Sequence, residues 1–83
     1  MPAVTFSTFI LSMASSTLVQ LGEVPDPVSK EKKPDQIMAK HSIDLLDMLK
    51  EKTRGNLDAG EQQMIDSMLF ELKMKYVKIF GEN

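Results

Sequence analysis

The chain has no cysteine, no tryptophan, one histidine, one tyrosine and only four glycines in 83 residues. Without cysteine, neither disulfides nor thiolate zinc sites can stabilise it. The few aromatic rings make a stacking surface for single-stranded nucleic acid improbable, and the isolated glycines form no phosphate-binding loop. A chain this short must therefore depend on well-packed helices or on self-association.

Neither sign of charge is in large excess, because the chain has ten Lys and Arg against twelve Asp and Glu. A net charge of −2 offers no basic field for phosphate backbones, so no nucleic-acid partner is expected. Residues 1–22 carry no charge at all. They lack the basic start of a secretory signal, and their Ser and Thr dilute a span that needs about 20 apolar residues. We expect a cytoplasmic protein, with peripheral membrane association through residues 5–21 as the alternative.

Helix-breaking residues divide the chain. A Pro-rich loop at 22–34 and the pair Gly55-Asn56 separate three segments, which predict an all-α chain with helices at about 5–21, 35–54 and 58–80. A strand within Val4–Leu11 is the weakest point of this assignment, because β-branched and aromatic residues gather there. The short second connection predicts an antiparallel hairpin of the last two helices. Residues 1–83 are expected to form a single helical domain.

The third segment has a clear start signal and two apolar faces. Asp58 and Glu61 have the spacing of a capping box. At about 100° per residue, one stripe faces a core; it consists of Ile65, Met68, Leu69, Leu72, Tyr76, Ile79 and Phe80. A second set lies on nearly the opposite face and consists of Phe70, Met74 and Val77. A helix with two apolar faces requires two partners.

The second segment is more conventionally amphipathic. Its expected inner face consists of Met38, Ala39, Ser42, Leu45, Leu46 and Leu49. Its expected outer face consists of Lys40, Asp44, Asp47 and Glu51. Gly55 follows a basic last turn and suits the left-handed position that ends many helices.

The first segment is apolar on one side and rich in small residues on the other. The apolar side consists of Phe6, Ile10, Met13, Ala14, Thr17 and Leu21. The other side consists of Thr8, Ser12, Ser15, Ser16 and Val19. Small residues let another backbone approach closely, so burial of both sides is favoured over ordinary exposure.

The apolar surface exceeds what one copy needs, because a three-helix monomer requires only one apolar stripe per helix. The simplest way to cover the excess is a symmetric homodimer, and we therefore predict a dimeric helical bundle. The predicted self-association residues are Ser12, Ser16, Val19, Phe70, Met74 and Val77.

Groups with catalytic chemistry are few. His41 lies near Asp44 and Asp47 on the second segment, and these three residues are the candidates for a metal site. A boundary histidine beside a solvated acidic face explains the same residues more simply. No serine has a base or orienting acid nearby. No catalytic residue and no cofactor are therefore expected.

Several strings resemble a known family. They are Phe6-Ser7-Thr8-Phe9-Ile10-Leu11-Ser12-Met13-Ala14-Ser15-Ser16, Leu21-Gly22-Glu23-Val24-Pro25-Asp26-Pro27, Ile43-Asp44-Leu45-Leu46, Glu51-Lys52-Thr53-Arg54-Gly55-Asn56-Leu57 and Leu72-Lys73-Met74-Lys75-Tyr76-Val77. The family is domain of unknown function 1844. The resemblance implies a small, mainly helical, bacterial and cytoplasmic protein, and it carries over no functional residues.

These observations favour a non-enzymatic, homodimeric protein-interaction or structural module. Two alternatives stay open. One is a peripheral membrane-associated protein that uses the uncharged first helix, and the other is a metal-dependent enzyme or metal-binding protein centred on His41.

Overall fold

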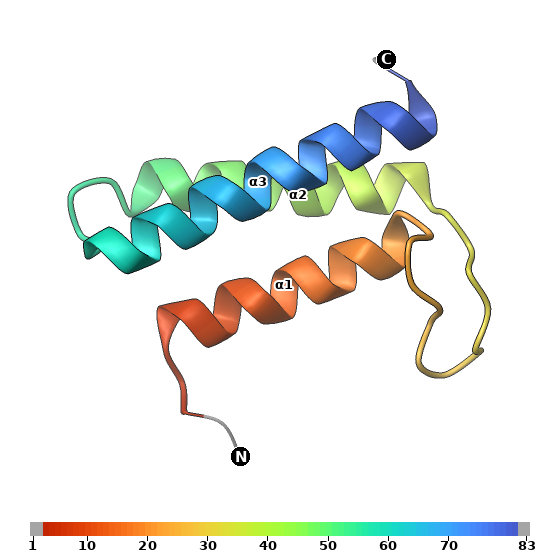
Figure 1. The fold of residues 1–83 in the computed structure, drawn as a ribbon, viewed down its shortest axis with the longest axis horizontal. Helices are drawn as coiled ribbons and strands as arrows, with labels where there is room; N and C mark the ends of the chain where they lie inside the picture. Colours follow the sequence, from red (N-terminus) through yellow and green to blue (C-terminus); the bar gives the residue numbers. More distant parts are fainter. Residues whose placement is uncertain (1–2, 82–83) are drawn as a thin grey trace.

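The computed structural model describes residues 3–81, and three helices make up its secondary structure (Figure 1). They are α1 (Phe6–Gln20), α2 (Gln36–Lys52) and α3 (Ala59–Phe80). The all-α, three-helix prediction is confirmed, and the strand considered for Val4–Leu11 is wrong because α1 begins at Phe6. Residues 1–2 and 82–83, which the single-domain prediction includes, lie outside the described part of the chain.

Each helix begins at a side chain that caps it. The expected capping box at α3 is confirmed: the Asp58 carboxylate accepts from the Glu61 amide at 2.8 Å, and the Glu61 carboxylate accepts from the Asp58 amide at 3.0 Å. The Asp35 carboxylate accepts from the Met38 amide at the start of α2. Thr5 and Thr8 form a capping box at α1 that the sequence analysis did not identify. These bonds satisfy amide groups that have no acceptor within the helix.

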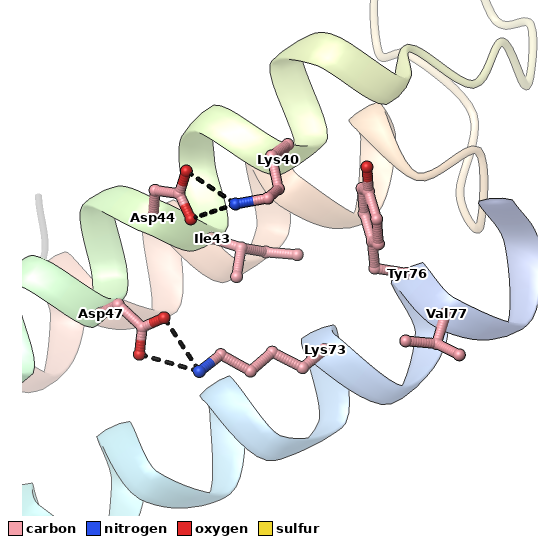
Figure 2. Close-up of a pocket in the computed structure, with 7 residues that line it drawn as sticks. All are labelled: Lys40, Ile43, Asp44, Asp47, Lys73, Tyr76 and Val77. Carbon is pink, nitrogen blue, oxygen red and sulfur yellow. Dashed lines mark hydrogen bonds and ion pairs between the residues drawn. The ribbon is translucent and has the colours of Figure 1, made fainter. Parts of the chain in front are cut away.

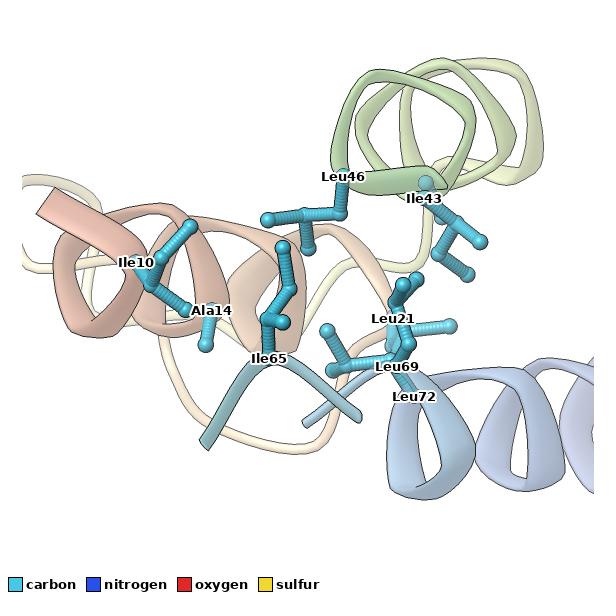
Figure 3. Close-up of a cluster of buried hydrophobic side chains, with 9 residues drawn as sticks. Ile10, Ala14, Leu21, Ile43, Leu46, Ile65, Leu69 and Leu72 are labelled. Atoms are coloured by element: carbon cyan, nitrogen blue, oxygen red, sulfur yellow. The ribbon is translucent and has the colours of Figure 1, made fainter. Parts of the chain in front are cut away.

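The core lies where the three helices meet (Figure 3). Every helix contributes aliphatic side chains that point toward the other two, and Leu21 joins them directly after α1. The buried set is Ile10, Ala14, Leu21, Ala39, Ile43, Leu46, Ile65, Leu69 and Leu72. The core is thin, as expected for a chain of this length, since each helix buries only three or four residues.

The buried face of α2 differs from the expected one. Met38 is exposed and Leu45 and Leu49 are only half-buried, whereas Ile43 is buried. The buried side is therefore turned toward Ile43. The reason is that α2 packs against α3 as well as α1, so the residues beside α3 are covered too.

Polar groups in the core are satisfied. The Ser42 hydroxyl donates to the side-chain oxygen of Gln20 at 2.6 Å and so ties α2 to α1. The buried Thr17 hydroxyl donates to the carbonyl of Met13 one turn earlier. Since buried polar groups without partners are costly, these bonds make two polar residues compatible with an aliphatic core.

The loop between α1 and α2 is closed at its base. The Asp35 amide donates to the carbonyl of Gln20 at 2.7 Å, so the two ends of the loop meet. Gly22 has a positive φ of 79°, and a Cβ built there would lie 2.7 Å from Cγ of Pro34. Only glycine fits this contact, which explains why Gly22 and Pro34 occur together.

The turn after α2 has a left-handed glycine in nearly the expected place. Gly55 has a φ of 85°, and the helix ends at Lys52 with Thr53 as its C-cap. Gly55 therefore lies within the connecting turn rather than directly after the cap. The basic last turn, with Lys50 and Lys52, is as expected.

The α2–α3 pair is held by polar contacts whose order is reversed between the two helices. Lys50 contacts Asp66 and Asp47 contacts Lys73, each at 2.9 Å. The Gln36 side-chain amide donates to the Tyr76 hydroxyl near the far end of the pair. The Cα positions span 36 × 34 × 15 Å, so the shortest dimension has room for two layers of helix packed about 8–10 Å apart. Every helix therefore keeps an outward side.

Candidate functional site

A shallow groove of about 350 Å³ lies between α2 and α3 (Figure 2). Four residues of α2 and three of α3 line it at helical spacing, so each helix presents one side to it. The lining residues are Lys40, Ile43, Asp44, Asp47, Lys73, Tyr76 and Val77.

Lysine–carboxylate pairs form the polar edges of this groove. The Lys40 ammonium contacts both oxygens of Asp44, at 2.7 and 2.9 Å, one turn along the same helix. This hydrogen bond to Asp44 raises the pKa of Lys40 above its ordinary value. The Lys73 ammonium crosses to Asp47 and links the two helices (Figure 2). Each pair is partly exposed to solvent, so its contribution to stability is small.

The centre of the groove is apolar. Ile43 is buried beneath it, and Val77 and the half-buried Tyr76 stand on the α3 side. The Tyr76 ring packs against Phe80 with centroids 5.0 Å apart, which holds it in place. With an aliphatic floor and internally paired charges, the groove suits an apolar side chain better than a charged ligand.

The outward side of α3 carries an apolar row. Phe70 is 68% exposed, Met74 58% and Val77 45%, and their spacing of four and three residues places them along one side of the helix. We refer to these three residues as the α3 row. Val77 belongs both to this row and to the groove, so the two features form one continuous surface.

The residues expected for self-association on α1 have different surroundings. Ser12 and Ser16 are exposed and Val19 is half-buried. Ser16 and Val19 line a hollow together with Asp26 and Pro27 of the loop. The chain's own loop therefore covers part of the small-residue side. Met74 and Val77 of the α3 row line a different hollow, on α3.

The candidate metal ligands are not brought together. His41 is exposed and does not line the groove, and Asp44 and Asp47 each contact a lysine instead. Among residues 3–81, no group of three or more His, Cys, Asp or Glu side chains is arranged to hold a metal ion. Both carboxylates are thus neutralised by lysine rather than held open for a cation.

The uncharged first helix is short. It spans fifteen residues, and within the described part of the chain no helix has the length and apolar content needed to cross a bilayer. It also has no basic residue in its last turn that could attract an anionic headgroup.

Sequence reasoning missed Ile43 and Lys73 as groove residues. Ala39, Ile43 and Leu46 follow the four-and-three spacing of a helix face, so the signal for Ile43 was present but the leucines nearby obscured it. Lys73 joins the groove only through its contact with Asp47, twenty-six residues away, for which the sequence has no local signal.

A family model described as "Domain of unknown function (DUF1844)" matches residues 3–78, a span that contains α1, α2 and most of α3. Among curated proteins and among solved structures, no match to the chain was found.

Proposed function

The chain belongs to the domain of unknown function 1844 family, and we propose that it is a non-enzymatic, homodimeric protein-interaction module. Its contact surface is the α3 row together with the adjoining groove. The observation that carries this proposal is the exposure of Phe70, Met74 and Val77 on one side of a helix whose other side contributes Ile65, Leu69 and Leu72 to the core.

An exposed row of this kind is unfavourable in an isolated chain. Each apolar side chain leaves water at a gain of about 25 cal/mol per Å² of apolar surface. Contiguous exposed apolar surface on a small protein is typical of an interaction site. A second copy is the simplest partner, because a two-fold axis lets the same row cover itself.

The groove supports a binding role rather than a catalytic one. Its carboxylates are paired with lysines at 2.7–2.9 Å, and the Lys73–Asp47 pair links the two helices. The reversed order of the contacts between α2 and α3 supports an antiparallel hairpin, which gives the α3 row a rigid backing.

Light scattering after size exclusion at micromolar concentration tests the proposal. We expect the mass of a dimer, twice 9.3 kDa. Met74→Asp should convert it to a folded monomer, because a buried unpaired carboxylate opposes association.

The matched control is Met48→Asp. Met48 is a methionine of α2 that is 45% exposed and lies outside both the groove and the α3 row. This variant should remain a dimer. A native protein that elutes as a monomer, or equal loss of the dimer in both variants, contradicts the proposed surface.

A further inference from the structure

Two charged residues accompany the α3 row along one flank. Glu71 and Lys78 are seven residues apart, which is close to two helical turns, so they lie on the same side of α3. Both are exposed, and within residues 3–81 neither takes part in an ion pair. Together with Met74, Lys75 and Val77 they line a hollow of about 440 Å³. The flank of the row therefore carries one free acid and one free base at its two ends.

We propose that two copies pack their α3 helices antiparallel about a two-fold axis beside Met74, with Glu71 and Lys78 forming two reciprocal ion pairs across it. This register rests on the proposed homodimer and goes further, because it specifies which residues of the two copies meet.

The charges select the antiparallel arrangement. Glu71 lies three residues before Met74 and Lys78 four residues after it, so a two-fold axis near Met74 brings each Glu71 opposite Lys78 of the partner subunit. In a parallel pair, Glu71 and Lys78 would instead lie at the same height as the same residues of the partner subunit, so neither would meet the opposite charge of this pair. Like charges on facing helices are unfavourable, whereas opposite charges at flanking positions set partner orientation.

The apolar row has the same symmetry. Phe70 lies one turn before Met74 and Val77 almost one turn after it, so the antiparallel register sets the bulky ring near the smaller Val77 of the partner subunit. A parallel pair would stack the two rings at one end and leave two valines at the other. The antiparallel register therefore distributes the volume evenly along the contact.

The groove in Figure 2 then receives a side chain. Val77 stands at its edge, so the partner subunit's Phe70 is directed toward the apolar space beside Tyr76 and Ile43. A groove of about 350 Å³ has room for a phenyl ring. The site is incomplete in one copy, because the ring that fills it comes from the other.

Charge reversal tests the ion pairs. Glu71→Lys and Lys78→Glu should each weaken the dimer about tenfold, because each replaces two attractive contacts by two repulsive ones. The double variant Glu71→Lys/Lys78→Glu should restore the native dissociation constant, measured by analytical ultracentrifugation at low salt. Circular dichroism confirms that each variant is folded.

Single cysteines test the orientation directly, because the native chain has none. Glu71→Cys and Lys78→Cys proteins are prepared separately, mixed and treated with a short bismaleimide. The proposed register gives mainly the mixed cross-link between the two variants, whereas a parallel register gives cross-links within each variant.

The outcomes separate this inference from the proposed function. A monomeric native protein overturns both. A native dimer that is not restored by the double reversal, or that cross-links only within each variant, overturns the antiparallel register and leaves the homodimer in place.

Discussion

Leu69 and Phe70 are adjacent large apolar residues of α3, yet the exposed fractions of their side chains differ widely. Leu69 is 3% exposed and packs in the core, whereas Phe70, about 100° further around the helix, is 68% exposed. The inner side of α3 packs against α1 and α2, whereas the outer side carries the exposed α3 row, of which Val77 borders the groove.

This difference teaches that apolar character and burial are separate properties. Both sides of α3 carry large apolar residues at helical spacing, so the pattern alone indicates two contact surfaces. Which surface is covered within one copy depends on where the other two helices pack. The following predictions test the two sides of this helix, from the largest expected effect to the smallest.

Replacing each of the two neighbours separates the sides most clearly. Leu69→Ala should lower the free energy of unfolding by about 2–5 kcal/mol, because it leaves a cavity in a thin core. Phe70→Ala should lower it less, and its effect should depend on protein concentration, because only association buries the ring. Urea unfolding at two protein concentrations measures both. A loss for Phe70→Ala that is as large as that for Leu69→Ala, at every concentration, contradicts the assignment of the two sides.

The second prediction concerns the loop that follows Leu21, a core residue that packs in the same cluster as the inner side of α3. Gly22→Ala should lower the free energy of unfolding by about 1–3 kcal/mol, because alanine disfavours a positive φ and its Cβ would meet Pro34. Thermal unfolding measures the loss. The control is Gly60→Ala, where a Cβ has ordinary space beside Asp58 at 3.5 Å, and this variant should gain up to about 1 kcal/mol.

The capping box at the start of α3 stabilises the whole helix, and therefore both of its sides. Asp58→Ala removes the capping box and should lower the free energy of unfolding by about 1 kcal/mol. Asp58→Asn keeps an accepting oxygen and should stay near the native value. Chemical denaturation of the two variants checks this, and equal losses in both would show that the negative charge, rather than the hydrogen bond, is responsible.

The smallest effect on stability is expected at the boundary between the inner and outer sides of α3, where Asp66 contacts Lys50 of α2. The hydrogen bond to Lys50 lowers the pKa of Asp66 below its ordinary value of 3.8. The carboxylate therefore stabilises the fold above about pH 4, and this contribution is lost as the pH falls through the lowered pKa. Asp66→Asn and Lys50→Gln should both flatten the acid limb of a Tm-against-pH curve. An unchanged limb in either variant contradicts the pairing.

The three helices were predictable because their signals are local. The spacing of Asp58 and Glu61 predicts the start of α3, and Gly22 and Pro34 predict the first loop. Which residues lie on the buried face of each helix was less predictable. Met38 lies on the expected inner face of α2 but is exposed, because the helix is turned toward Ile43 by its contact with α3.

The candidate surface was predictable in part. The α3 row follows from the four-and-three spacing of Phe70, Met74 and Val77. The groove beside it does not, because it joins Lys73 to Asp47 across two helices. Val19 was assigned to self-association from its place on a small-residue side, and the sequence did not predict that it lines a hollow together with Asp26 and Pro27 of the loop.

By itself, the sequence determined that this chain forms three helices, where they begin and end to within two residues, and that α3 has two apolar sides. These properties depend on hydrogen bonds and periodicity within a few residues of each position. Only the tertiary structure decided which side of α3 is buried, that Gly22 must accommodate Pro34, and that Lys73 pairs with Asp47 in the groove. Each of these depends on packing between segments that are distant in the chain, where geometry rather than local pattern sets the contact.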